Sequence, residues 1–247
     1  MRAFLVEALH ALTDLDGRFL RSFRTLLMKP GELTVAYRAG RRKEFLGPLQ
    51  AFLVANVAFF AIEALSRDHV FATSLASHVG LQDWKALAQS IVNERLQRLD
   101  TSFDDYALRF DLAAARNAKM LVVLMTLPFM LLLPLFQPGK ARGIVVRAAF
   151  SLHLYAFLLL LFSAALVFAD LQLALGGDGL HSPRVDLWLS ALLLVGCIAY
   201  LFLALGRVYP AGWPARLLRS FGLGVVVAAI VPGYRFLIFI ITLYTTR

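Results

Sequence analysis

Five long apolar stretches constrain this chain more than any other feature, because each approaches the length that a helix needs to cross a bilayer. About 20 consecutive, mostly apolar residues are required. The composition agrees, since 60% of the 247 residues are hydrophobic and only 17% are charged, whereas a soluble domain is roughly 45–50% apolar. We therefore expect an all-α, polytopic membrane protein, and exclude an ordinary soluble enzyme, a disordered tail and a disulfide scaffold. The stretches cover residues 45–65, 120–136, 148–171, 185–205 and 221–244.

The fifth stretch is interrupted by Pro232, Gly233, Tyr234 and Arg235. Irregular backbone at membrane depth is tolerated only where protein or a water-filled cavity covers it. Two interpretations follow. A broken helix that still spans the bilayer gives about five transmembrane helices, which we favour, and a re-entrant hairpin gives four.

Basic residues indicate how the chain is oriented. Nine Lys and Arg residues precede the first stretch, and the links after the second and fourth stretches carry three each with no acid. The connection at 66–119 is neutral, with seven basic and seven acidic residues. Because positive residues stay inside, we expect a multi-pass protein of the bacterial inner (plasma) membrane with a cytoplasmic N-terminus. Residues 1–44 then form a cytoplasmic amphipathic segment, and residues 45–247 form a transmembrane bundle that includes an external helical connection at 66–119.

The segment before the first stretch has one apolar helical face. A stripe of this kind beside a membrane anchor predicts an amphipathic helix lying in the membrane interface, and the alternative is packing on the cytoplasmic ends of the spans. Gly17 is a point at which this helix can divide, and residues 32–39 predict a short helix that Gly40 closes. The stripe consists of Phe4, Leu5, Ala8, Leu9, Leu12, Leu15, Phe19, Phe23, Leu26 and Leu27.

The connection at 66–119 contains two further helical patterns. Residues 82–99 carry an apolar stripe that includes Trp84 and Leu99, which predicts a helix lying across the outer face. Residues 103–119 predict another helix, which runs into the second span.

Several short motifs resemble a bacterial membrane family known as domain of unknown function 3667. The resemblance implies membrane location and no particular activity. Many members of that family begin with a four-cysteine zinc ribbon, which this sequence lacks, so no metal function carries over. The motifs are Leu15-Asp16-Gly17, Thr25-Leu26-Leu27, Lys29-Pro30-Gly31-Glu32, Tyr37-Arg38-Ala39-Gly40-Arg41-Arg42, the run at 150–157 and the run at 203–209.

Arg235 is the clearest functional candidate, because an ionisable residue within a span is costly unless it is paired or solvated. Its candidate partners are Glu63 and Asp170, both near the outer ends of their spans. A contact with substrate or lipid headgroup, a structural pair or carbonyl clamp, and a near-surface position in a re-entrant loop are the three interpretations. The adjacent Tyr234 is a further polar candidate.

The remaining intramembrane polar residues predict contacts between helices. His153 is the histidine of the third stretch, where a lone histidine usually makes an interhelical hydrogen bond. Asn56 and Glu63 share a face of the first stretch, as Ser163 and Asp170 do on the third, so we expect a polar seam between them. We predict no metal site and no cofactor. His69, His78 and His181 with Asp68 and Asp178 read as scattered outer residues rather than ligands.

No catalytic pattern is present, since the chain has no HExxH, GxSxG or P-loop motif. The leading hypothesis is therefore a non-catalytic scaffold or accessory subunit that organises lipid or partner proteins. The alternatives are a small transporter or channel that uses the intramembrane polar residues, and a lipid-modifying enzyme. The expected partners are membrane lipids and other membrane proteins, not nucleic acid, and the oligomeric state is open. Candidates for binding anionic headgroups are Arg38, Arg41, Arg42 and Lys43.

Overall fold

The computed structural model describes residues 17–66, 70–71, 73–137, 143–177 and 179–246, and these contain helices and no strand. The first helix covers 17–28. The helices that follow are α2 (Glu32–Arg38), α3 (Pro48–Leu65), α4 (Leu75–Gly80), α5 (Lys85–Leu99), α6 (Phe103–Leu121), α7 (Thr126–Leu132), α8 (Ile144–Ala174), α9 (Pro183–Val208) and α10 (Trp213–Thr245). Short 3-10 turns are η1 (Val122–Met125), η2 (Leu133–Phe136) and η3 (Gly179–His181).

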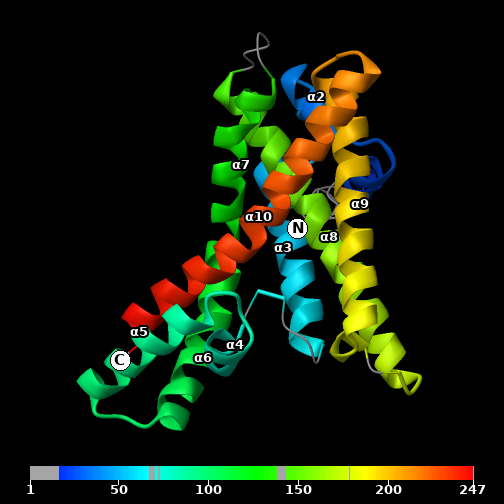
Figure 1. The fold of residues 1–247 in the computed structure, drawn as a ribbon. Coiled ribbons are helices and arrows are strands. Elements are labelled where there is room, and N and C mark those ends of the chain that lie inside the picture. The colour runs from blue at the N-terminus through cyan, green and yellow to red at the C-terminus, as the bar shows by residue number, and fades with distance from the viewer. Residues whose placement is uncertain (1–16, 67–69, 72, 138–142, 178, 247) are drawn as a thin grey trace, which may run out of the picture.

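Five of the described helical segments are long and apolar enough to cross a membrane, which confirms the predicted all-α, five-span fold. They are Pro48–Leu65, Phe103–Phe136, Ile144–Ala174, Arg184–Val208 and Trp213–Thr245. The ends of the helices gather in two groups (Figure 1). Helix α2 lies with the α7–α8 and α9–α10 links at one end, which we call the α2 end. Helices α4–α6 and the α8–α9 link lie at the other, which we call the α5 end.

The second span is one long rod assembled from α6, η1, α7 and η2. Pro128 and Pro134 lie in it and cannot donate a backbone hydrogen bond, so the chain tightens locally into 3-10 turns. Two carbonyls at the end of α6 are taken by side chains from neighbouring helices. Tyr234 donates to the carbonyl of Ala118 over 2.8 Å, and Asn56 Nδ2 donates to that of Lys119 over 3.4 Å.

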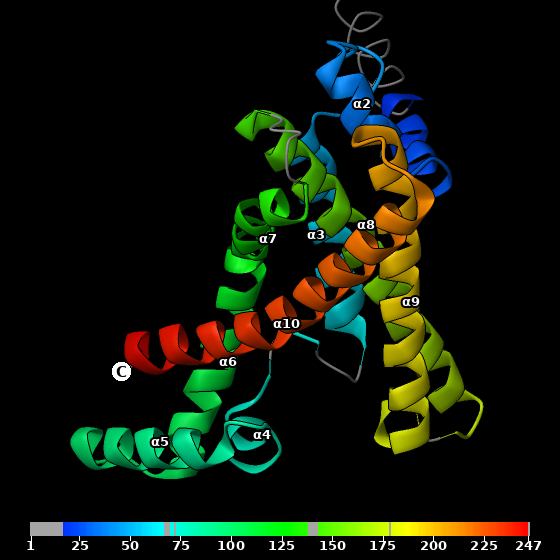
Figure 2. The ribbon, with the colours of Figure 1, turned by 45° about the horizontal axis from the view of Figure 1, so that its top comes forward.

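Helix α10 is continuous through Pro232 and long enough to span, so the favoured prediction of a fifth span is confirmed, whereas the expected break and the alternative of a re-entrant hairpin are wrong. Proline removes only one intrahelical hydrogen bond, and a long helix tolerates this with a bend. Gly233 keeps a helical conformation rather than a positive φ. The helix crosses obliquely from the α9 link toward α5 (Figures 1 and 2), so it contacts both ends of the molecule.

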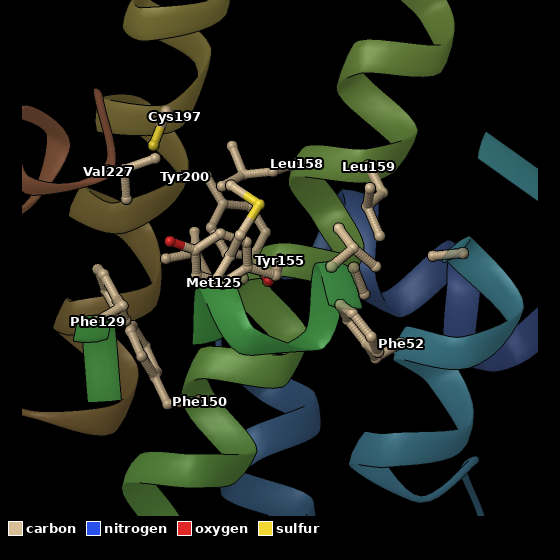
Figure 3. Packing of buried hydrophobic residues seen from close by; sticks show 14 of the residues in the cluster. Phe52, Met125, Phe129, Phe150, Tyr155, Leu158, Leu159, Cys197, Tyr200 and Val227 are labelled. Carbon is tan, nitrogen blue, oxygen red and sulfur yellow. The ribbon is translucent and has the colours of Figure 1, made fainter. Parts of the chain in front are cut away.

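The main core surrounds α8, and all the other described spans contribute side chains to it. Figure 3 shows Phe52 of α3, Met125 of η1, Phe129 of α7 and Tyr200 of α9 converging on residues of α8 such as Tyr155. Rings pair across these contacts. Phe129 stacks on Phe150 with centroids 6.3 Å apart, and Phe157 stacks on Tyr200 at 4.0 Å.

A second, smaller core lies at the α5 end, where α4, α5 and α6 pack on the last turns of α10. This confirms the predicted helices at 82–99 and 103–119, which begin and end within three residues of α5 and α6. Tyr106, Phe110 and Phe239 are fully buried in it. The hydroxyl of Tyr106 donates to the carbonyl of Leu243 over 2.9 Å, which joins α6 to α10.

Part of the predicted N-terminal stripe lies in the helix at 17–28. Leu26 is buried against the bundle, whereas Phe19 and Leu27 of the stripe and the neighbouring Leu20 are exposed, so the position of this helix in a membrane interface stays a prediction. Helix α2 instead packs on α8 and α9 and buries Leu33. Its predicted stop at Gly40 is confirmed, because Gly40 has a φ of 77°. The predicted stripe from Phe4 to Leu15 lies outside the described residues.

Candidate functional site

A cavity of about 310 Å³ lies between α8, α9 and α10 in the half of the bundle nearer the α5 end. Its walls are mostly aliphatic. Leu158, Cys197 and Val227, which Figure 3 labels, belong both to the cavity wall and to the main core. Of the described residues that line it, Arg235 and Asp186 carry charge. The cavity therefore has a long apolar part and one charged end.

Arg235 is held at this cavity by the backbone of a neighbouring connection. Its Nε donates to the carbonyl of Val70 over 2.8 Å. Glu63 holds the same connection from the other side, because its Oε1 accepts the N–H groups of Val70 at 2.7 Å and Phe71 at 3.1 Å. The predicted carbonyl clamp on Arg235 is thus present, but the carbonyl is that of Val70 rather than one freed by Pro232. Glu63 helps to position Arg235 indirectly, by holding Val70, and forms no ion pair with it among the described contacts.

Asp186 is the charged neighbour of Arg235 that sequence reasoning missed. It lies in the first turn of α9, where a carboxylate also favours the positive helix end. Together with Glu63, it supplies the negative field around the Arg235 guanidinium. The sequence did contain a signal that could have identified it, because Asp186 is the acidic residue of the fourth apolar stretch. Its pairing with Arg235 depends on how far α10 tilts, which the sequence does not reveal.

The other predicted partner and the predicted seam involve polar residues of the first and third spans. Asp170 is half-buried near the end of α8. Ser163 donates to the carbonyl of Leu159 in its own helix, Asn56 bonds to α6, and Glu63 bonds to residues 70 and 71. Asn56, Glu63 and Ser163 thus each bond to a backbone group, while α3 and α8 pack together, and the seam with Asp170 stays a prediction.

His153 and Tyr234 both make the interhelical contacts expected of buried polar groups in a bundle. His153 Nδ1 and the hydroxyl of Thr34 lie 2.9 Å apart, which joins α8 to α2, so the predicted interhelical bond is confirmed. His153 is 2% exposed. Tyr234 joins α10 to α6 and packs edge-on against Phe71 with centroids 5.6 Å apart. Neither side chain lines the cavity.

Of the predicted outer histidines, His78 is the one whose side chain is described. Within the described ranges, no group of three or more His, Cys, Asp or Glu residues is arranged to hold a metal ion. His78 is buried in the small core and accepts a hydrogen bond from Trp84 Nε1 over 3.2 Å. Burial, and secondarily the positive charge of Arg235, lower the pKa of His78 to about 4. The predicted residues Asp68, His69 and Asp178 and the side chain of His181 lie outside what is described.

The four predicted headgroup residues are exposed at the α2 end but differ in their contacts. Arg41 forms ion pairs with Glu32 at 2.8 Å and Glu44 at 3.3 Å, and the hydrogen bond with Glu32 raises the pKa of this guanidinium. Arg42 lies 5.2 Å over the ring of Tyr37. Arg38 and Lys43 complete the exposed set.

Comparison with known proteins gives one finding. Residues 16–60 match the family described as "Protein of unknown function (DUF3667)", which confirms the resemblance over this part of the chain. The match covers the helix at 17–28, α2 and most of α3. No curated protein and no solved structure matches the chain.

Proposed function

We propose that this protein is a non-catalytic membrane scaffold that holds a lipid-class amphiphile in the cavity between α8, α9 and α10. The observation that carries the proposal is the shape of the site, with aliphatic walls that end at Arg235 and Asp186. Ligand pockets are typically about 300–1,000 Å³, so a cavity of about 310 Å³ suits one acyl chain rather than a whole phospholipid. Opposite charges at its end suit a headgroup that carries both signs.

The two alternative functions find less support in the same geometry. A transporter needs a path to the α2 end, whereas the cavity wall reaches the main core at Leu158, Cys197 and Val227. A lipid-modifying enzyme needs a reactive group beside the ligand, and His153 is instead buried against Thr34. A bound, unmodified lipid is the simplest use of the site.

We also propose that the α2 end faces the cytoplasm of a bacterial cell and that the α5 end lies outside the inner membrane. Arginines and lysines concentrate in the segment at 17–47 and beside the α9–α10 link, which supports this orientation. A reporter fused after Gly80 should therefore behave as external, and one fused after Lys140 as cytoplasmic. The opposite pattern would overturn the orientation.

Two neighbouring alanines of α10 test the cavity. Ala228 lines it, whereas Ala229 lines a separate groove between α7 and α10, and both are exposed. Ala228→Phe should fill the cavity and lower the amount of lipid that native mass spectrometry finds on the purified protein. Ala229→Phe should leave that amount unchanged. Equal lipid retention in both variants and the unchanged protein would refute the proposal.

A further inference from the structure

A small basic pocket of about 190 Å³ lies at the α2 end, where the helix at 17–28, α2 and the start of α3 meet. Three arginines line it, namely Arg18, Arg41 and Arg42, together with Gly47 and Gln50. We propose that this pocket binds a phosphate group, and that it is distinct from the lipid cavity at the other half of the bundle.

The charge balance of the pocket favours an anion. Glu32 and Glu44 already neutralise Arg41 through ion pairs. Arg42 makes a cation–π contact with Tyr37 and forms no ion pair with an acid among the described residues. Within the same ranges, Arg18 is bound to carbonyls, at 2.9 Å from that of Phe45 and 3.4 Å from that of Arg42, and its Nε is buried without a hydrogen-bond partner. Two arginines are therefore available to an incoming anion.

The first span adds a further attraction. Helix α3 begins at Pro48, and its N-cap Gly47 has no side chain to cap the exposed N–H groups. The N-terminus of a helix carries about half a positive charge and is a ready site for phosphate. Gln50 accepts the N–H of Gly47 over 3.1 Å, which fixes the backbone beside the arginines. The positive end of the α3 dipole and the arginine guanidinium groups thus both act on the same small pocket.

The position of the pocket matches the depth of lipid headgroups. Because α3 is a candidate span that begins at Pro48, Gly47 lies at the membrane boundary. The exposed Phe19 and Leu20 of the adjoining helix suit insertion beside that boundary. A phosphate in this pocket can belong to a phospholipid or arrive free from solution, and the chemistry recognised is the same.

The test uses the full chain in phosphatidylcholine nanodiscs that contain a minor fraction of phosphatidylglycerol, with retained phosphatidylglycerol counted by native mass spectrometry. Arg42→Gln and Arg18→Gln should each lower that retention about fivefold more than the loss of a nearby surface charge does, because each removes a hydrogen-bond donor to the phosphate, worth about 1 kcal/mol. Arg21→Gln and Arg24→Gln are the matched controls, because they remove the same charge from exposed positions of the helix at 17–28 but do not line the pocket. Arg42 makes no described hydrogen bond with its side chain, so its variant reports on the pocket even if Arg18→Gln unfolds.

A second arm identifies the source of the phosphate. Thermal unfolding is followed in detergent as inorganic phosphate replaces chloride at constant ionic strength. Stabilisation of the unchanged protein but not of Arg42→Gln indicates free phosphate, and selective loss of phosphatidylglycerol in the first arm indicates lipid. Either result supports the pocket. If the pocket variants and the controls lose binding equally, or if neither ligand distinguishes them, the proposal is overturned.

Discussion

The α2 end and the α5 end of the molecule are stabilised by different kinds of contact. At the α2 end, polar side chains reach across to the N-terminal segment, as when Arg207 donates to the carbonyl of Pro30 over 2.7 Å and Thr34 meets His153. At the α5 end, buried rings of Tyr106, Phe110 and Phe239 form a compact apolar core. The first kind of contact is directional and the second depends on volume, so the two ends should respond differently to substitution.

The contrast also separates the electrostatic roles of the two ends. Basic residues outnumber acidic ones across 17–47 at the α2 end, although Arg41 pairs there with Glu32 and Glu44, whereas the two kinds are balanced across 73–119 at the α5 end. A surface rich in unpaired positive charge attracts anionic lipid, and a balanced surface does not. If the α2 end faces the cytoplasm as we propose, its excess of basic residues lies beside anionic headgroups.

The largest effect is expected from Phe239→Ala at the α5 end. Removing a fully buried ring leaves a void, and such changes cost about 3–5 kcal/mol. Hydrogen exchange should rise across 75–110 and stay unchanged across 17–47. Leu237→Ala, at a 40% exposed site of the same helix, is the control and should alter neither region. Loosening at both ends would show that the two regions do not behave as separate units.

Gly31→Ala should have the next largest effect, at the α2 end. Gly31 has a φ of 85°, and an added Cβ would lie 2.8 Å from the carbonyl oxygen of Ala204 in α9. The conformation and the steric clash together should destabilise docking by about 3 kcal/mol, measured by thermal unfolding and by proteolysis of the segment. Gly40 shares the positive φ but has open space around it. Gly40→Ala should therefore show only the part of the destabilisation that comes from the backbone conformation. Equal effects would mean that the approach to α9 is unimportant.

Thr34→Val should destabilise the α2 end by about 2 kcal/mol, because it leaves a buried nitrogen of His153 without its partner. Thr34→Ser keeps the hydroxyl and should retain most of the stability. Chemical unfolding of both variants measures the difference. A Val variant as stable as the Ser variant would show that this bond does not hold the segment.

Mild acid should give the smallest change at the α5 end, through His78 of α4. The folded-state pKa of His78, about 4, lies below the value of about 6.5 in the unfolded chain. The stability that neutral His78 supports is therefore complete above pH 6.5 and is lost as the pH falls from 6.5 toward 4. Between pH 7 and 6 the loss should be less than about 1 kcal/mol, seen as faster hydrogen exchange in α4 and α5. His78→Leu should abolish this pH dependence, and a persistent dependence would assign it to another group.

The parts predicted correctly from the sequence are those that local composition determines. Apolar length specifies the spans, and the amphipathic pattern specifies α5 and α6. The interhelical role of His153 was also predicted, but its partner was not, because Thr34 is 119 residues away. Such pairings depend on how helices dock, which no local pattern encodes.

The site was harder to predict for the same reason. Arg235 was recognised from its cost within a span, whereas Asp186 and the carbonyl of Val70 reach it only because α10 is tilted and continuous. The expected break at Pro232 did not occur, since one missing hydrogen bond is small beside the packing along a 33-residue helix. Arg18 was not among the predicted headgroup residues, although the fold brings it beside Arg41 and Arg42.

The contact between α10 and α4–α6 has a consequence for how the chain is made. A chain is synthesised from its N-terminus and its parts fold as they emerge, so α4–α6 are complete long before Phe239 and Leu243 exist. Their small core remains open until α10 arrives, and Arg95 then donates to the carbonyl of Thr246 over 3.0 Å. Completion of this layer therefore requires that α10 has been synthesised and has packed in place. A chain that stops short of α10 would display unfilled aromatic surface, which is the feature that chaperones and proteases recognise.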